Sequence, residues 1–302
     1  MTQGNLRPLA YLTGAVALWG TSFAVTKAAY ATFPPMTVMW LRMLVALIVF
    51  LPFLPRVTRP VYRSGDWKPL ALSALLLPCA YYTLEGFAIT FTTSSQAGVI
   101  SAVMPLIVAI SAWAILRERT TWRAAVAIVA SILGVVILSV AGVEQLSAPN
   151  PLLGNLLELS AMVAAAGATI AIKHLSSHYD PWLLTGLQMA VGCIFFAPLA
   201  LASGPVEWAA IPVQGWLSVF YLGAGCGLAA FGLYNSALRL VPATQAALMI
   251  NLIPAVAMIT GWLALGESLT PIQVAACVLI VAAVSYSEVS GRRARALVDA
   301  RV

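Results

Sequence analysis

The sequence predicts an all-α integral membrane protein with ten transmembrane helices, arranged as two inverted repeats of five helices. The first observation behind this prediction is composition: 61% of the 302 residues are hydrophobic and only 9% are charged, whereas soluble domains carry about 25% charged residues. The second is a stretch of 28 positions that occurs twice, 149 residues apart, so that Gln96 falls on Gln245 and Pro105 on Pro254. Internal duplication in a membrane chain is typical of secondary transporters.

Ten apolar runs are each about 20 residues long, which is the length that crosses a bilayer as a helix. They do not alternate with a period of two, so membrane-barrel strands are not expected. The first repeat occupies residues 1–142, an outer linker follows at 143–151, and the second repeat with its basic tail occupies 152–302. The predicted spans are 9–30, 35–54, 68–90, 95–116, 122–142, 152–174, 180–201, 213–238, 243–264 and 270–289.

Individual elements carry further signals along the chain. The first apolar run has spanning length and no small-residue cleavage site behind it, so we expect it to be retained as a helix. Pro105 in the fourth span and Pro254 in the ninth predict either a kink that shapes and gates a cavity or a carbonyl left free for a ligand. Between these two spans, the linker sequence GVEQLSAPNP is rich in turn-forming residues. Four glycines between positions 223 and 232 of the eighth span predict close helix contact.

The placement of charge predicts the topology. Every Lys and Arg except Lys27 and Arg42 falls on one side of the predicted spans, while Glu144, Glu207 and Glu267 fall on the other. Basic residues accumulate in cytoplasmic loops, so we expect both termini in the cytoplasm. Because five spans per repeat is an odd number, the second repeat must start outside, and the repeats are inverted. The basic patches are therefore topology signals, and we expect no nucleic-acid partner.

The repeated pattern resembles the drug/metabolite transporter superfamily, specifically its EamA-type exporters. The matching elements are WGTSFAVTKAA at 19–29, the run from Gln to Pro in the fourth and ninth spans, and the turn GE-x-LT at 266–270. The first repeat departs from this turn and reads RE at 117–118. In length and in its aromatic residues near the midplane, the chain is most similar to the aromatic amino acid exporter branch. The resemblance implies export as the direction of transport.

Two basic and two acidic side chains lie within the spans, in the outer third of the membrane: Lys27, Arg42, Glu85 and Glu158. An unpaired charge costs roughly 2.5–3.5 kcal/mol at a helix centre, so we expect these four charges to compensate one another. Two interpretations stay open. Either the charges pair and fasten helices together, with the Lys27 side chain extending to the membrane surface, or some of them face a cavity, where they meet a zwitterionic substrate or carry a coupling proton. Glu85 is the stronger proton candidate because it follows Tyr81 and Tyr82.

Aromatic and polar side chains near the midplane predict the wall of a central cavity. Lipid offers no partner to an indole N–H or a phenol, so these groups favour a cavity or the helix core. Asn251 has no polar counterpart in the first repeat, where Ala102 stands, and asymmetric polar residues more often serve a substrate. The predicted substrate-binding residues are Trp19, Ser22, Tyr81, Tyr82, Glu85, Tyr234, Asn235 and Asn251.

A glutamate recurs in the turn that follows the fourth and ninth spans, as Glu118 and Glu267. The inversion of the repeats puts these two residues on opposite faces of the membrane. A residue that recurs on both faces is not expected to have a chemical role that is specific to one side of the membrane. We therefore interpret both as structural residues that cap or brace the turn into the next helix.

The sequence predicts a secondary transporter that exports small organic metabolites across the bacterial inner membrane by alternating access. Amino acids with aromatic or apolar side chains are the leading substrates, and a broader small-solute or drug exporter of the same fold is the alternative. An intramembrane enzyme is a remote alternative, because the spans lack a nucleophile with a base or a metal cluster. We expect no metal and no cofactor. The partners are the substrate and the lipid bilayer, while proton coupling and oligomeric state are left open.

Overall fold

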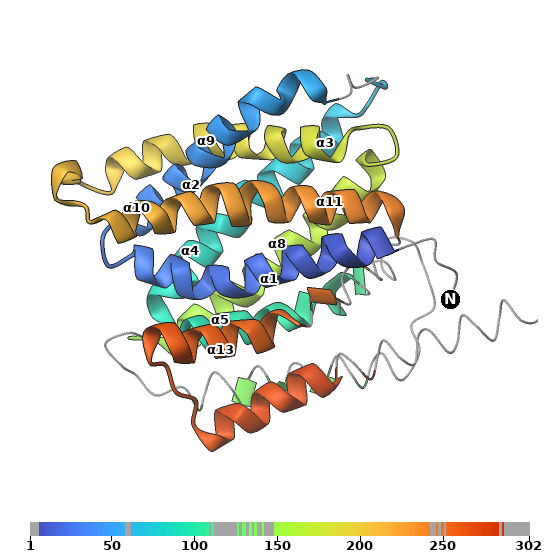
Figure 1. Ribbon diagram of the computed structural model, residues 1–302. Coiled ribbons are helices and arrows are strands. Elements are labelled where there is room, and N and C mark those ends of the chain that lie inside the picture. The colour runs from blue at the N-terminus through green and yellow to red at the C-terminus, as the bar shows by residue number, and fades with distance from the viewer. Residues whose placement is uncertain are drawn as a thin grey trace, which may run out of the picture.

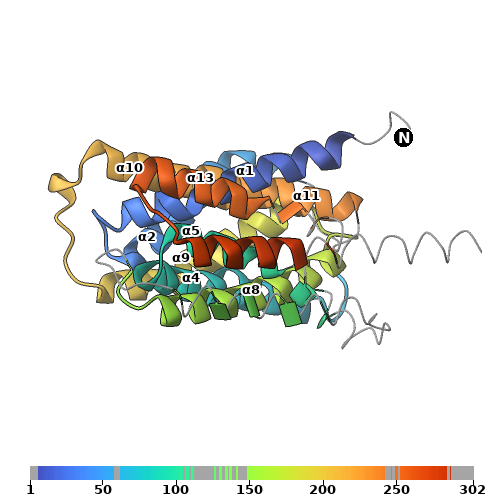
Figure 2. The same ribbon diagram turned by 90° about the horizontal axis from the view of Figure 1, so that it is seen from below.

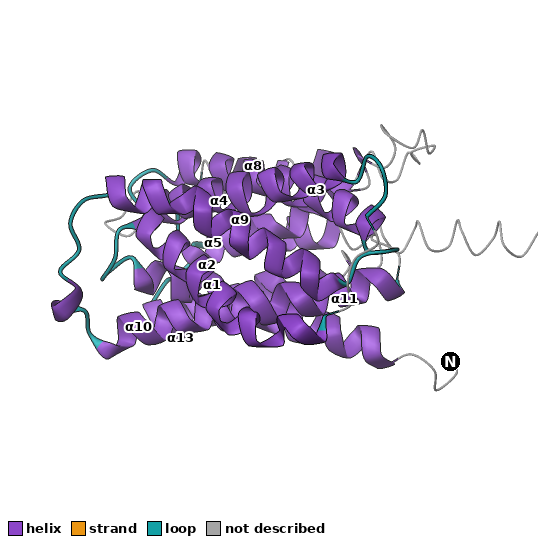
Figure 3. Ribbon diagram, turned by 90° about the horizontal axis from the view of Figure 1, so that it is seen from above, coloured by secondary structure: helices purple, strands orange, loops and turns teal. Residues whose placement is uncertain are grey.

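The computed structural model describes residues 6–57, 62–104, 106–108, 110–111, 148–241, 249–250 and 252–283, with the positions 126, 129–130, 133–134, 136–137, 141, 246 and 286. Within this part of the chain, the helices lie side by side along one common direction and are connected at two ends (Figure 1). Figure 3 shows the loops of the described residues gathered at these two ends, as a membrane-spanning bundle requires.

Six helices of the described residues are long and apolar enough to cross a membrane: Arg7–Ala29, Pro35–Arg56, Trp67–Phe91, Pro151–Leu175, Pro181–Ala202 and Val213–Leu240. Each coincides with a predicted span. Shorter apolar helices over Ser94–Val108, Ile253–Leu265 and Pro271–Ala283 lie within three further predicted spans. The span at 122–142 falls largely outside the described residues. The helical membrane class is thus confirmed, and the count of ten stays a prediction.

The sequence sets several helix starts through proline and short polar side chains. α2 (Pro35–Phe50), α8 (Pro151–Leu175) and α9 (Pro181–Ala202) all begin at a proline, whose missing N–H has no intrahelical partner at that position anyway. The Asn150 side chain accepts a bond from the N–H of Leu153 at 3.1 Å. Likewise, Asp180 accepts one from the N–H of Trp182 at 2.8 Å. These caps begin the two central helices of the second half.

The third span is broken in its middle, although the sequence predicts one uninterrupted helix over 68–90. It consists of α3 (Trp67–Ala74), a π-helical segment η2 (Leu75–Ala80) and α4 (Tyr81–Phe91). Leu77 has extended backbone angles, φ −139° and ψ 112°, because Pro78 disfavours a helical conformation in the residue before it. The Leu77 carbonyl accepts a bond from Nε2 of Gln188 on α9 at 3.0 Å. The carbonyl exposed at the break therefore has a hydrogen-bond partner on a neighbouring helix.

The eighth span follows the same plan, with α10 (Val213–Phe220), a π-helical segment η5 (Tyr221–Ala230) and α11 (Phe231–Leu240). A Cβ on Gly223 would lie 2.7 Å from the carbonyl oxygen of Arg42 on α2. On Gly232 it would lie 2.2 Å from the Trp182 ring. The close helix contact predicted from this glycine-rich stretch is confirmed, since neither position has room for a side chain.

The ninth span does not have the predicted form. The sequence predicts a helix over 243–264 kinked at Pro254, whereas the chain makes a turn at Leu252 and α13 (Ile253–Leu265) starts there anew. Pro254 therefore lies in the first turn of α13, where its missing N–H breaks no helical bond. α13 ends at Gly266, whose φ of 64° is left-handed and favours glycine. Pro254 begins a helix instead of bending one.

Helices of the first half pack mainly against helices of the second. α2 packs on α9 and on η5, α4 on α8, and α1 (Leu6–Ala29) on α13 and α11. Figure 2 shows α13 beside α1 on one side of the bundle and α4 beside α8 on the other. The core lies between the halves, so a cavity in the core is built by both.

Candidate functional site

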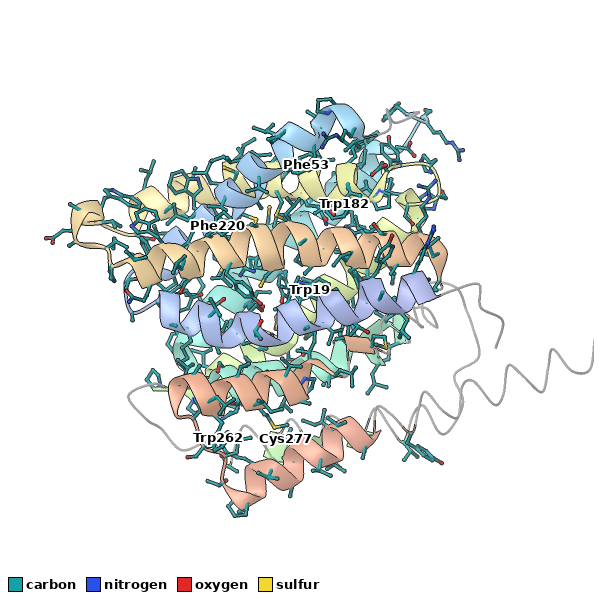
Figure 4. The ribbon with its side chains drawn as sticks, viewed as in Figure 1. Trp19, Phe53, Trp182, Phe220, Trp262 and Cys277 are labelled. Atoms are coloured by element: carbon teal, nitrogen blue, oxygen red, sulfur yellow. The ribbon has the colours of Figure 1, made fainter. Side chains whose placement is uncertain are left out.

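A small cavity lies in the centre of the described bundle, where the break in the third span meets α1, α8 and α11. Its volume is about 60 Å³, well below the ~150 Å³ of a protein cavity that takes up benzene. Figure 4 shows Trp19 between α1 and α11. The lining residues are Trp19, Ser22, Phe23, Arg42, Leu77, Tyr81, Tyr82, Glu85, Ser101, Met104, Met162, Ala165, Thr169, Phe231, Tyr234, Ile250 and Ile253.

One wall of the cavity is aromatic. The Trp19 ring lies 4.7 Å from that of Phe231 and 5.1 Å from that of Tyr234, measured between centroids. Tyr81 and Tyr82 form an edge-to-face pair at 4.9 Å. The Trp19 indole donates to the carbonyl of Cys226 at 3.2 Å, which fixes the plane of the ring. The result is a wall of flat surfaces, suited to a ring or a branched apolar group.

A buried ion pair lies beside Tyr81 and Tyr82 in the lining of the same cavity. Nη1 of Arg42 on α2 lies 3.7 Å from Oε2 of Glu85 on α4. The Arg42 guanidinium also lies over the Tyr82 ring, 4.3 Å from its centroid, and Nη2 is 3.4 Å from the Tyr82 hydroxyl. On the other side, the Tyr81 hydroxyl donates to Glu85 at 2.5 Å. The two tyrosines thus hold the ion pair in place, while Nε of Arg42 has no hydrogen-bond partner.

Glu158 lies beside this ion pair but is outside the cavity lining. It is completely buried, with 0% of its surface exposed, and neither of its carboxylate oxygens has a hydrogen-bond partner. It stands one helical turn before Met162, which lines the cavity, so both side chains project from the same face of α8. Of the four charged residues, Arg42 and Glu85 therefore form a pair, and Glu158 lies near them without a partner of its own.

Lys27 does not belong to this group, contrary to the expected compensation among four charges. Its Nζ donates to the carbonyl of Thr92, the residue that follows α4. The long lysine side chain reaches the helix end, where carbonyls have no intrahelical partner. Lys173 does the same in the second half, donating to the carbonyl of Val241, which follows α11, at 2.9 Å. Lys27 therefore caps a helix end and does not neutralise Glu85 or Glu158.

Glu267 also has a partner that the sequence did not predict. It accepts hydrogen bonds from the backbone N–H groups of Ser94 at 2.8 Å and Ser95 at 2.9 Å. Both serine hydroxyls donate to Oε2, at 2.9 and 2.7 Å. The carboxylate therefore caps α5 (Ser94–Ile100) of the first half and not the turn into the helix that follows it. Negative charge is stabilised at this helix N-terminus, and the contact joins the two halves at one end of the bundle.

A second contact joins the halves at the other end. Oδ2 of Asp66, in the loop before α3, accepts from the Tyr179 hydroxyl at 3.1 Å and from the N–H of Arg63 at 2.8 Å. It lies 3.1 Å from Nε2 of His178. Burial alone would raise the pKa of Asp66, but the bonds from Arg63, His178 and Tyr179 together hold that pKa below its ordinary value. The two halves are thus joined by one such contact at each end of the bundle.

Comparison with known proteins identifies the family. A model of the EamA-like transporter family matches residues 6–140 and again residues 152–287. The chain belongs to this family. Among the curated relatives of this EamA-like transporter, the uncharacterized transporter YcxC of Bacillus subtilis is 29% identical over 90% of this chain and 89% of its own. YetK, from the same organism, is 25% identical over 85% of this chain and 79% of its own.

More distant relatives extend beyond bacteria. An uncharacterized transporter of Archaeoglobus fulgidus is 24% identical over 83% of this chain and 86% of its own. One crystal structure shares 19% sequence identity with the EamA-like transporter and covers 95% of this chain and 98% of its own, with a TM-score of 0.66. That likeness shows the fold alone. The chain is therefore a multi-pass membrane transporter, and these names specify no substrate.

The structure places the predicted substrate-binding residues of the EamA-like transporter in three groups. Six line the cavity: Trp19, Ser22, Tyr81, Tyr82, Glu85 and Tyr234. The prediction for Asn235 is wrong: it lies away from the cavity, and its amide donates to Thr185 on α9 at 2.9 Å. A helix turns by about 100° per residue, so Asn235 cannot share the face of its neighbour. Asn251, with Pro105 and Glu118, lies outside the described residues.

Sequence reasoning missed the small and aliphatic part of the lining. Thr169 on α8 and Ser101 in η3 (Ser101–Val103) line the cavity. The Thr169 hydroxyl donates to a carbonyl of its own helix at 2.9 Å, and the Ser101 hydroxyl donates to the carbonyl of Gly98, in the preceding α5, at 2.6 Å. Leu77 reaches the cavity through the break at Pro78. Pro78 is the one signal that could have indicated this, since it stands in the middle of a predicted span.

Proposed function

We propose that this EamA-like transporter exports amino acids with aromatic or apolar side chains from the cytoplasm by alternating access. The observation that carries the proposal is the pairing of two surfaces in one buried cavity. The aromatic wall of Trp19, Phe231 and Tyr234 suits a ring, and the Arg42–Glu85 pair offers one charge of each sign. A zwitterion with a flat side chain needs both. The bacterial inner membrane is the location that we propose with it.

Alternating access is supported by the size of the cavity. A volume of about 60 Å³ is too small for an aromatic amino acid, given that benzene alone occupies a cavity of ~150 Å³. The site must therefore widen before it binds such a substrate. The two contacts across the halves, at Glu267 and at Asp66, are the ones that must open in turn. Each joins segments that are far apart in sequence.

We also propose that the halves are inverted repeats with both termini in the cytoplasm. The recurring contact of Lys27 with Thr92 and Lys173 with Val241 supports the repeat. The ends of α4 and α11, where these contacts lie, are at opposite ends of the bundle (Figure 1). The basic ends of η1 (Leu51–Arg56) and α11 share the end at which α1 starts. Such clustering favours a cytoplasmic location for that end.

Transport in liposomes tests the proposal. Purified protein should accumulate phenylalanine and tryptophan, and Trp19→Ala should reduce their uptake more than that of threonine. Aromatic stacking contributes about 0.5–1.5 kcal/mol beyond burial, so the expected change in selectivity is about 2- to 13-fold. Tyr82→Ala should have the same effect. Tyr82→Phe is its matched control, because it keeps the ring under Arg42.

The outcomes separate the proposal from its alternatives. Equal loss for all amino acids would assign the aromatic residues to packing alone. Transport of apolar drugs but of no amino acid would favour the broader small-solute or drug exporter, which the many apolar lining residues support. An intact protein that transports neither class would contradict the substrate proposal.

A further inference from the structure

Glu158 has surroundings that an ionised carboxylate does not tolerate. It is fully buried, and both of its oxygens are without a hydrogen-bond partner. An unpaired charge in such a place costs several kcal/mol, whereas a neutral carboxyl costs far less. Glu85, by contrast, has the Arg42 guanidinium and the Tyr81 hydroxyl. The two carboxyl groups of this region therefore have different environments.

The charged and titratable groups around Glu158 do not compensate a negative charge on its carboxylate. Glu85 on α4 is the charge that acts on it directly, and Tyr81 and Tyr30 lie within its electrostatic range. Arg42 is also in this region, but its guanidinium pairs with Glu85 and neutralises the charge of that residue. α5 and η3, which also pack on α8, carry no ionisable residue.

The remaining neighbours of α8 carry their charges elsewhere. Lys68 stands at the start of α3 and Arg239 at the end of α11. Both lie at the end of the bundle opposite the start of α8 (Figure 1). Glu158 is only seven residues, or about 11 Å, from that start. Among the described elements that pack on α8, no basic side chain lies beside Glu158, so an ionised Glu158 gives this region an uncompensated negative charge.

We propose that Glu158 binds a proton and the ammonium group of the substrate in alternation, so that one proton enters for each amino compound exported. The proposal rests on the function proposed above and extends it. Within that function it moves the ammonium group from Glu85, which Arg42 and Tyr81 already hold, to Glu158. The Arg42 guanidinium, whose Nε has no hydrogen-bond partner, is left for the carboxylate of the substrate. The class of substrate is accordingly a primary amine that also carries a carboxylate.

The exchange requires no co-reactant. On the cytoplasmic side, the O–H bond of the Glu158 carboxyl breaks, its proton leaves to water, and the carboxylate accepts hydrogen bonds from the ammonium group. On the outer side, the ammonium group leaves and a proton from water binds to the same carboxylate. Glu158 lies one helical turn before Met162, on the face of α8 that lines the cavity. Widening the cavity along this face therefore connects it to the Glu158 carboxyl.

Calorimetry measures the exchange directly. Titration of the purified protein with phenylalanine, in two buffers of different ionisation enthalpy, gives the number of protons released on binding. We expect about one proton per bound molecule at acidic pH, with release declining as the pH is raised and the free carboxyl ionises. Glu158→Gln should release none, and Glu207→Gln, in an exposed loop, should release as much as the natural protein. Release that persists in Glu158→Gln, or that is lost only in Glu85→Gln, overturns the proposal.

An infrared measurement tests the proton on Glu158 without any substrate. The acid-minus-alkaline difference spectrum of the protein in liposomes should contain the carbonyl band of a protonated buried carboxyl, absent from Glu158→Gln and present in Glu158→Asp. A spectrum without this band overturns the proposal even if amino acids are transported. If the band is present but no amino acid binds, the substrate class proposed above fails, and the protonated Glu158 stands.

Discussion

At the scale of single residues, the Glu267 contact is the clearest case of a side chain whose role only the structure reveals. The carboxylate accepts bonds from two backbone N–H groups and two hydroxyls at the start of α5. Sequence identifies it as a structural residue, because it recurs at Glu118. It does not identify the recipient, which lies more than 170 residues away. The pattern of a capping motif is local, whereas this cap comes from a different half.

The loss of this cap should destabilise the protein. Removing an N-cap side chain costs about 0.5–2 kcal/mol, so Glu267→Ala should lower the thermal unfolding midpoint in detergent. Glu207→Ala is the matched control, because this glutamate lies exposed in the loop between α9 and α10. If both variants unfold at the temperature of the natural protein, the Glu267 contact makes no contribution to stability.

The Asp66 carboxylate should make the stability of the protein depend on pH. Its pKa is held below the ordinary value by the bonds from Arg63, His178 and Tyr179. A carboxyl with a lowered pKa in the folded state contributes stability above its unfolded pKa, and this stability is lost as the pH falls through the folded value. Asp66→Asn should therefore unfold at a lower temperature than the natural protein at neutral pH. The difference should begin to shrink below about pH 4 and vanish as the pH falls through the lowered pKa of the folded state, and a difference that is constant with pH would contradict this.

The candidate site was predictable from sequence only in part. Charge inside an apolar span is conspicuous, so Arg42, Glu85 and Glu158 were found. Lys27 has the same signature but a long flexible chain, and nothing in the sequence says that it extends to the carbonyl of Thr92. Asn235 adjoins Tyr234 in sequence, yet it faces Thr185 on another helix. Which face a helix turns inward depends on packing, and uniformly apolar spans carry little periodicity to indicate it.

At the scale of elements, spans were predictable and interruptions were not. Apolar length locates a helix in a membrane without regard to its internal geometry. The π-helical segments at Leu75–Ala80 and Tyr221–Ala230 leave that length unchanged. The break at Pro78 depends on a partner, the amide of Gln188. Pro254 was expected in the middle of a helix, but it stands in the first turn of α13, after a turn at Leu252.

The contact between η5 and α2 yields a prediction at this scale. A Cβ added to Gly223 would lie 2.7 Å from the carbonyl oxygen of Arg42 and from Cβ of Val45, so Gly223→Ala should lower the free energy of unfolding by about 1–3 kcal/mol. Gly225→Ala is the control within the same segment, since its nearest neighbour would be an ordinary 3.5 Å away. It should leave the unfolding midpoint unchanged or raise it slightly. Equal effects of the two substitutions would show that close packing at Gly223 is unimportant.

At the scale of the whole molecule, the orientation in the membrane is open to a direct test. In a background without the native cysteines, a cysteine at Ser203, which follows α9, should react with an impermeant reagent added outside intact cells. A cysteine at Ser64, in the loop before α3, should react only after the cells are opened. Labelling of Ser64→Cys in intact cells would reverse the proposed topology. Reaction of both from outside would exclude a topology with these two loops on opposite sides.

The packing of each half on the other has a consequence for biosynthesis. Because α2 packs on α9 and α4 on α8, the first helices to leave the ribosome must wait in the lipid for later ones. Arg42 and Glu85 both belong to the part made first and pair with each other, so these two charges enter the bilayer as a neutral pair. Glu158 arrives afterwards as a neutral acid. With this order of synthesis, Arg42, Glu85 and Glu158 enter the membrane without an isolated charge among them.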